Sequence, residues 1–101
     1  MTDRENEERC RVGSVVFAKA GRERGKLMAV VASEGDYRYL VDGQMRLLSK
    51  PKKKKLMHIQ KTNWSIDLSR LAADEGRRYS DGDIKKKLAA LLKGGEDIVE
   101  E

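Results

Sequence analysis

Two stretches of this chain concentrate side chains that can bind phosphate groups. The first carries Arg22, Arg24 and Lys26 on a short segment with Gly21 and Gly25. Arginine forks grip phosphate oxygens two at a time, and backbone amides in a turn add further donors. Glycine takes positive φ without steric cost, so the two glycines allow the backbone to turn sharply. An ordinary solvated hairpin tip has the same composition, and these residues alone leave both interpretations open.

The second stretch is a run of lysines, Lys52–Lys55, preceded by Lys50 and Pro51. Four consecutive lysines repel one another, which an exposed loop tolerates and a phosphate backbone relieves. Because Pro51 cannot donate to a sheet ladder, we expect it to end a strand and to open a lysine loop. Lysines act as point charges, so this loop is expected to add affinity rather than sequence choice. The alternative is a solvated charged face.

Other polar and aromatic side chains give weaker indications. Arg46 and Arg38 are expected on outward strand faces, where they extend the basic surface or serve solubility. His58 has no ligand set of Cys, His or carboxylate around it, so no metal role is expected of it and a contact to RNA stays open. Tyr37 and Tyr39 alternate onto one strand face, a pattern that favours packing in the core or at a barrel edge over base stacking.

No arrangement of residues typical of an enzyme stands out. There is no nucleophile and base pair, no phosphate-cradling loop of the nucleotide-hydrolase kind and no zinc-ligand spacing. The single cysteine, Cys10, cannot form an internal disulfide, so we expect a reduced thiol at the edge of the first strand. We therefore predict a non-catalytic protein with no cofactor and no metal.

The net charge of +5 is distributed unevenly along the 101 residues. Residues 1–8 sum to −3, residues 9–61 hold 14 basic and 4 acidic residues, and residues 62–101 sum to −2. A basic segment between acidic or neutral flanks indicates a polyanionic partner bound at one place. No apolar run approaches 18 residues and the start has no signal-peptide pattern, so we expect no membrane segment and a cytoplasmic location.

Alternating apolar residues and turn signals predict a small, twisted antiparallel barrel, which closes on itself and so removes exposed edges. Asp42 followed by Gly43 is the strongest hairpin signal, because a type I′ turn needs positive φ at both central residues. The predicted strands cover residues 12–19, 26–33, 37–41, 44–48 and 56–61.

One or two helices are expected after the barrel. Residues 65–73 are predicted as a short helix with Ser65 or Asp67 as N-cap, and Trp64 is expected to staple the barrel to the helices. A better helix runs from residue 81 to residue 93, because Ser80 and Asp83 form a capping pair and the apolar residues recur at helical spacing. Gly94 and Gly95 are expected to stop it, before an acidic tail at 96–101. Residues 1–10 are expected to be disordered.

Two blocks of residues carry a resemblance to a known family. The first resembles a KOW motif, an alternating segment around a pivotal glycine that Gly25 matches, and its residues are Val15, Val16, Gly21, Arg24, Gly25, Lys26 and Val30. The second follows in the same order as in the family and consists of residues 39–43, Arg46, residues 50–54 and His58. Together they are similar to the eukaryotic-type large-subunit ribosomal protein fourteen family and to its short stand-alone bacterial relatives.

The resemblance covers about residues 11–63 and implies an SH3-like five-stranded antiparallel barrel of the KOW type. It also implies binding to RNA, ribosomal RNA of the large subunit above all, through basic barrel loops, with ribosomal proteins as further partners of the helical extension at 64–95. The oligomeric state stays open. The residues assigned to RNA contact are Lys19, Arg22, Arg24, Gly25, Lys26, Arg46, Lys50, Lys52, Lys53, Lys54, Lys55 and His58.

Two other functions fit the same residues. SH3-like barrels also bind polypeptides, and the amphipathic helix at 81–93 offers an apolar face for a partner or a second copy. A DNA-binding nucleoid factor is the other alternative, because charge attraction by itself does not distinguish DNA from RNA.

Overall fold

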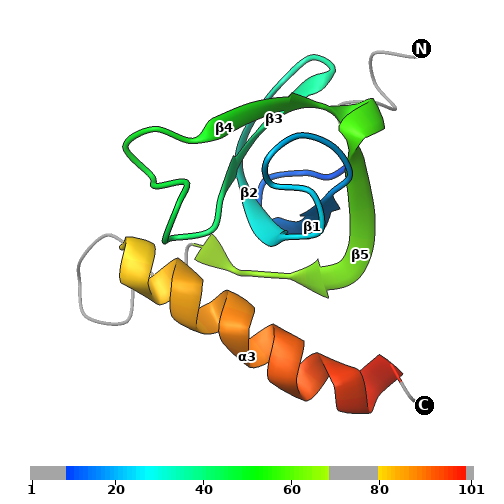
Figure 1. Cartoon of the computed structure of the whole chain (residues 1–101), viewed down its shortest axis with the longest axis vertical. Coiled ribbons are helices and arrows are strands. Elements are labelled where there is room, and N and C mark those ends of the chain that lie inside the picture. Colours follow the sequence, from blue (N-terminus) through cyan, green and yellow to red (C-terminus); the bar gives the residue numbers. More distant parts are fainter. Residues whose placement is uncertain (1–8, 69–79, 100–101) are drawn as a thin grey trace.

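Five antiparallel strands curl into a barrel-like sheet, and one long helix lies along its lower side in Figure 1. This computed structural model describes residues 9–68 and 80–99. The strand order is β4-β3-β2-β1-β5, and the 3-10 turn η1 joins the two edge strands. The prediction of a mainly β chain with a small antiparallel barrel-like sheet and a C-terminal helix is therefore confirmed. The elements are β1 (Ser14–Ala18), β2 (Leu27–Glu34), β3 (Tyr37–Val41), β4 (Lys52–Lys55), η1 (Leu56–His58), β5 (Ile59–Ser65) and α3 (Asp81–Val99).

The first half of β2, Leu27–Val30, is buried on both faces, which explains its continuous apolar sequence. Met28 and Val30 point into the barrel, where one core cluster gathers around them. Leu27 and Ala29 point outward, where a second cluster joins the sheet to α3. Successive side chains of a strand point to opposite faces, so a strand between two cores has no polar face.

Helix α3 covers the outer side of the sheet. Ile84 and Leu88, one turn apart, are buried in the second cluster, and Leu91 packs against it. The predicted capping pair is present: the Ser80 N–H donates to Asp83 Oδ2 at 2.8 Å, and the Asp83 N–H donates to Ser80 Oγ at 3.2 Å. Trp64 packs against the same cluster, as expected of a residue that joins barrel and helix.

The predicted strand at 44–48 is wrong. Asp42 Oδ1 accepts hydrogen bonds from the backbone N–H groups of Gln44, Met45 and Arg46, at 2.8 to 2.9 Å, so these amides are turned away from a ladder. Cys10 is the one non-glycine residue of the described ranges with positive φ, so Asp42 and Gly43 do not form a type I′ turn.

The lysine run is a strand and not the predicted loop. Strand β4 pairs with β3 from Leu40↔Lys52 to Tyr37↔Lys55. A strand sends successive side chains to opposite sides, which separates the four ammonium groups and lowers their mutual repulsion. This alternation decides which lysines reach solvent.

Three further element boundaries differ from the prediction. Helix α3 continues through Gly94 and Gly95 to Val99, because a glycine inside a helix costs only about 1 kcal/mol and does not forbid helical φ and ψ. Strand β5 begins at Ile59, after η1, and extends to Ser65. Most of the helix predicted at 65–73 lies outside the described residues.

Arg38 is fully buried, which overturns its expected place on the outward face. Its Nε donates to the carbonyl oxygen of Cys10 at 2.9 Å, its Nη2 to that of Arg9 at 2.7 Å and its Nη1 to that of Gly35 at 2.8 Å. The guanidinium thus ties the segment before β1 to the β2–β3 turn. Cys10 has a free thiol, as predicted, but it lies in the barrel core, where burial raises the pKa of the thiol.

Gly43 is a point at which the β3–β4 loop meets the first turn of α3. Its φ is +78°, and a Cβ there would lie 2.8 Å from the Lys85 N atom and closer still to the Asp81 carbonyl oxygen. The Leu48 N–H also donates to Asp81 Oδ1 at 2.7 Å. The β3–β4 loop therefore contacts the N-terminus of α3 at two places, Gly43 and Leu48.

We predict that Gly43→Ala lowers the free energy of unfolding by about 3 kcal/mol or more, from left-handed strain plus a backbone clash. Gly35→Ala is the matched control, because Gly35 has φ +58° but open space around its Cβ, so only the strain of about 1 to 2 kcal/mol applies. Urea titration of both variants measures the difference. Equal costs for the two substitutions would contradict the clash.

Candidate nucleic-acid interface

The loop between β1 and β2 is a tight double turn that presents two arginines. The Gly25 N–H donates to the Ala18 carbonyl oxygen at 2.8 Å, and the Arg24 N–H donates to that of Gly21 at 3.2 Å. The glycines have φ of +82° and +86°, as expected of the turn. Arg22 and Arg24 are exposed on either side of the buried Glu23. We call these three residues and the glycines around them the arginine loop.

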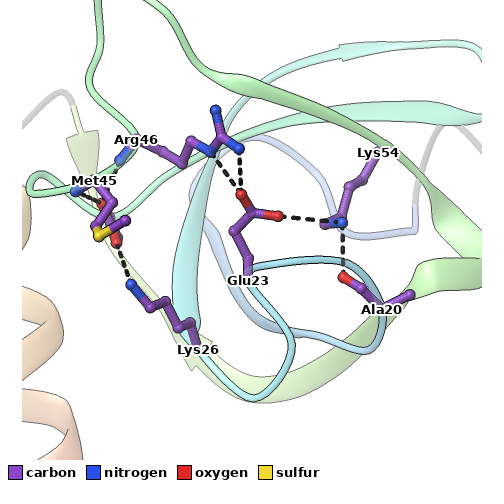
Figure 2. Close-up of polar contacts among 7 residues, drawn as sticks. Ala20, Glu23, Lys26, Met45, Arg46 and Lys54 are labelled. Atoms are coloured by element: carbon purple, nitrogen blue, oxygen red, sulfur yellow. Dashed lines mark hydrogen bonds and ion pairs between the residues drawn. The ribbon is translucent and has the colours of Figure 1, made fainter.

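Glu23 is the anchor of the arginine loop (Figure 2). Its Oε2 accepts from Arg46 Nε at 2.6 Å and lies 2.5 Å from Arg46 Nη2. Its Oε1 lies 3.5 Å from Lys54 Nζ, which donates to the Ala20 carbonyl oxygen at 2.8 Å. Glu23 is only 4% exposed and Lys54 only 8%. A single buried carboxylate therefore joins the arginine loop to the β3–β4 loop and to β4.

The charge state of Glu23 follows from these partners. Burial by itself raises the pKa of its carboxyl, but the hydrogen bonds from Arg46 and from a backbone N–H, with the charges of Arg46 and Lys54, outweigh it. The pKa of Glu23 is therefore below its usual value, and the carboxylate is ionised at neutral pH. We call Glu23 with Arg46 and Lys54 the buried hub. Its charged carboxylate fixes the positions of the two cations.

A second ion pair supports the same loop. Lys26 Nζ lies 3.8 Å from Asp42 Oδ2, which links the end of the arginine loop to the start of the β3–β4 loop. Burial by itself raises the pKa of Asp42. Hydrogen bonds from the N–H groups of its own loop and the charge of Lys26 have the larger effect, so the pKa of Asp42 is below its usual value. Both loops thus share two anionic anchors.

The predicted RNA-contact residues fall into three groups. Exposed side chains belong to Lys19, Arg22, Arg24, Lys50, Lys53, Lys55 and His58. Partly exposed side chains belong to Lys26, Arg46 and Lys52, and Gly25 exposes its backbone. Lys54 is buried against Glu23, so its expected exposure on a loop is wrong. The cause is the strand alternation, which turns Lys54 inward.

The structure brings some predicted residues together and separates others. The Lys19 N–H donates to the His58 carbonyl oxygen at 2.8 Å, which places these two residues side by side beyond the end of β1. The side chain of Lys54, on β4, also reaches the start of the β1–β2 loop, where it donates to the Ala20 carbonyl oxygen. Lys53 and Lys55, however, point to the other side of β4 from Lys54.

On that other side, Lys53 and Lys55 lie over two tyrosines. Lys53 Nζ is 4.6 Å from the Tyr37 ring centroid and 5.8 Å from that of Tyr39, and Lys55 Nζ is 5.9 Å from Tyr37. Both rings are partly exposed on the barrel wall, and neither belongs to the two core clusters. Of the two predicted places for Tyr37 and Tyr39, the core is therefore wrong and the edge of the barrel is correct. We call these four residues the tyrosine–lysine face.

Glu23 and Lys54 are the residues whose roles the sequence analysis missed. One signal was present: Glu23 is the single acid in an otherwise basic loop. Its buried position depends on Arg46 and Lys54, which are 23 and 31 positions further along the chain, so local pattern alone did not show the pairing.

Comparison with protein-family models gives no match for this chain, and comparison with curated proteins gives none either. In the part of the chain that the structure describes, no helix combines the length and the apolar character needed to cross a bilayer.

We predict that Glu23→Gln lowers the free energy of unfolding at pH 7 by on the order of 3 kcal/mol, because two cations lose a buried carboxylate. The lowered pKa means that this contribution is complete above the ordinary value of 4.5 and is lost as the pH falls through the folded-state value. The wild-type protein should therefore lose more stability between pH 5 and acidic pH than the variant, as urea titrations at several pH values would show. Glu34→Gln, which removes an exposed carboxylate, is the control and should change stability little at pH 7. Parallel pH profiles for the wild type and Glu23→Gln would contradict the hub role.

Proposed function

We propose that this chain is a non-catalytic RNA-binding protein whose arginine loop contacts the phosphate backbone of folded RNA. The single observation that carries the proposal is the way in which the few acids of residues 9–61 are used. Glu23, Glu34 and Asp42 each pair with a lysine or an arginine. Arg22 and Arg24 are exposed and form no ion pair with any residue in the described ranges. Their charge remains available for a polyanion.

The buried hub gives this surface a fixed shape. Glu23 holds the loop from beneath, and backbone hydrogen bonds close it from within, so the two arginines are presented on a short, restrained turn. A restrained loop loses little conformational entropy when it binds, and each phosphate it neutralises releases counterions. Binding by this route depends on the shape of the RNA backbone more than on base sequence.

The resemblance to KOW proteins supports ribosomal RNA, that of the large subunit in particular, as the RNA concerned. A cytoplasmic location and contacts with ribosomal proteins belong to the same proposal. Helix α3 supports such contacts, because it exposes an apolar side chain, Leu92, to solvent.

A groove beside the arginine loop favours a second candidate function, the docking of an apolar protein segment. The groove has a volume of about 370 Å³ and runs between the loop end at Gly25 and helix α3. Leu92, on its helix side, is 48% exposed, although Leu88 beside it is buried. Exposed apolar surface of this kind is typical of interaction sites.

For the RNA proposal, we predict that Arg22→Gln and Arg24→Gln each weaken binding to a ribosomal RNA fragment and lower the slope of log K against log salt by about 1. Neither side chain is needed for the fold, so the unfolding temperature should stay the same. Lys86→Gln, which removes an equal charge on α3, is the control and should leave the slope unchanged. Fluorescence titrations over a range of salt concentrations measure the slopes. A flat salt response of the wild-type protein would contradict the proposal, and equal binding to duplex DNA would favour a DNA-binding factor.

For the groove, we predict that Leu92→Asp abolishes co-purification of ribosomal proteins that persists after ribonuclease treatment. Ala90→Asp is the matched control, because it places the same carboxylate on an exposed part of α3 outside the groove. Partners that are released by ribonuclease alone, whatever the helix variant, would exclude this second function.

A further inference from the structure

The tyrosine–lysine face is a surface that the barrel does not need for its own cores. Tyr37, Tyr39 and Val41 are the outward residues of β3, because Arg38 and Leu40 between them are buried inside. Val41 is covered by the cluster beneath α3, whereas the two tyrosines belong to neither cluster. The outer face of β3 thus passes from a packed half to an aromatic half that α3 does not cover.

On this half, each tyrosine of β3 is paired with a lysine of β4 across the ladder. Lys55 lies directly opposite Tyr37 and Lys53 directly opposite Tyr39 in the β3–β4 ladder. Lys53 is 48% exposed although its Nζ lies 4.6 Å from the Tyr37 ring centroid, so the ammonium group is over the ring and still in contact with solvent. Residues two positions apart on a strand are separated by about 7 Å. The two rings are therefore spaced by about this distance along β3, and the two lysines by the same distance along β4.

Glu34, an acid beside this face, is already engaged. Glu34 Oε1 accepts from the Tyr39 hydroxyl at 2.7 Å and lies 3.6 Å from Lys53 Nζ. The hydroxyl hydrogen bond, with the charge of Lys53, lowers the pKa of Glu34. The carboxylate therefore holds the Tyr39 ring in place and pairs with Lys53, and it leaves Lys55 with no ion pair among the described residues.

Such a pattern matches unpaired nucleotides better than a duplex. Bases that are free of a duplex stack on aromatic rings, and the cations beside the rings contact the phosphates between them. Aromatic residues on an exposed sheet face bind two or three bases in this way in RNA-recognition domains. In a duplex the base faces are hidden, so only the lysines would contribute.

We propose that the tyrosine–lysine face binds a single-stranded RNA segment, with bases stacked on Tyr37 and Tyr39 and phosphates held by Lys55. Lys53 is paired with Glu34 and lies over the Tyr37 ring, so it moves aside when a base stacks on that ring. This inference rests on the proposed RNA-binding function and adds the class of RNA. The position of the face fits an RNA that also contacts the arginine loop, because both lie on opposite sides of β4, an edge strand of the sheet. A chain that crosses this edge reaches both surfaces.

The test uses the full chain, a 12-nucleotide oligouridylate as the single-stranded probe and a 12-base-pair RNA duplex as the comparison. Tyr37→Leu and Tyr39→Leu keep apolar bulk but remove the ring, whereas Tyr37→Phe and Tyr39→Phe keep the ring. We expect each leucine variant to bind the oligouridylate about 5-fold or more weakly, which is the lower end of the range for one lost stack. Tyr37→Phe should stay within 2-fold of wild type. Tyr39→Phe also loses the hydroxyl hydrogen bond to Glu34, so its affinity should lie between those of the wild type and Tyr39→Leu. No variant should change duplex affinity by more than 2-fold. Thermal unfolding of each variant checks that the fold is kept.

The outcomes separate this inference from the function on which it rests. If the leucine variants bind the oligouridylate as well as the wild type, the tyrosine–lysine face does not bind single-stranded RNA. An equal loss of duplex affinity would contradict the proposal in the same way. If binding to the ribosomal RNA fragment still falls with Arg22→Gln in that case, the proposed function stands without the face. A wild-type protein that binds none of the three RNAs would overturn both.

Discussion

A buried carboxylate between two cations is the constraint on which the arrangement of this molecule depends. Glu23 contacts Arg46 and Lys54 from inside the β1–β2 loop and so sets the relative positions of two loops and an edge strand. Burying Glu23 and Lys54 away from water has a large cost, which their mutual attraction and the contact with the partly exposed Arg46 must offset. Here the geometry that they define is that of the loop with the exposed arginines.

The second constraint is strand alternation, which sorts the cations of the basic segment into two kinds. Arg38 and Lys54, neighbours across the β3–β4 ladder, point inward and bind carbonyl oxygens or Glu23. Lys53 and Lys55 point outward, over tyrosine rings. The same residue type thus has a structural role at one position and is available to a ligand at the next. A positive net charge by itself therefore overstates the surface that a polyanion can reach.

Small size explains why the helix is part of the fold. A barrel of about 50 residues buries too little apolar surface for much stability, and its interior here is one modest cluster. Helix α3 adds a second cluster on the other face of β1 and β2, which contains Ile84 and Leu88. The glycine at position 43 allows the β3–β4 loop to touch the first turn of this helix. The loop that carries Arg46 is therefore held from two directions, by the helix and by Glu23.

The sequence by itself determined the features that depend on local pattern. Alternation predicted β1 and β3, and an apolar run predicted β2. The Ser80 and Asp83 pair predicted where α3 begins, and the glycines of the β1–β2 loop predicted its turns. Tertiary structure alone decided that the lysine run is a strand, that Arg38 and Lys54 are buried, and that Asp42 closes a loop in place of a hairpin. The reason is physical: local backbone preference depends on neighbours along the chain, whereas the burial of a charge depends on whether distant oxygens compensate its lost hydration.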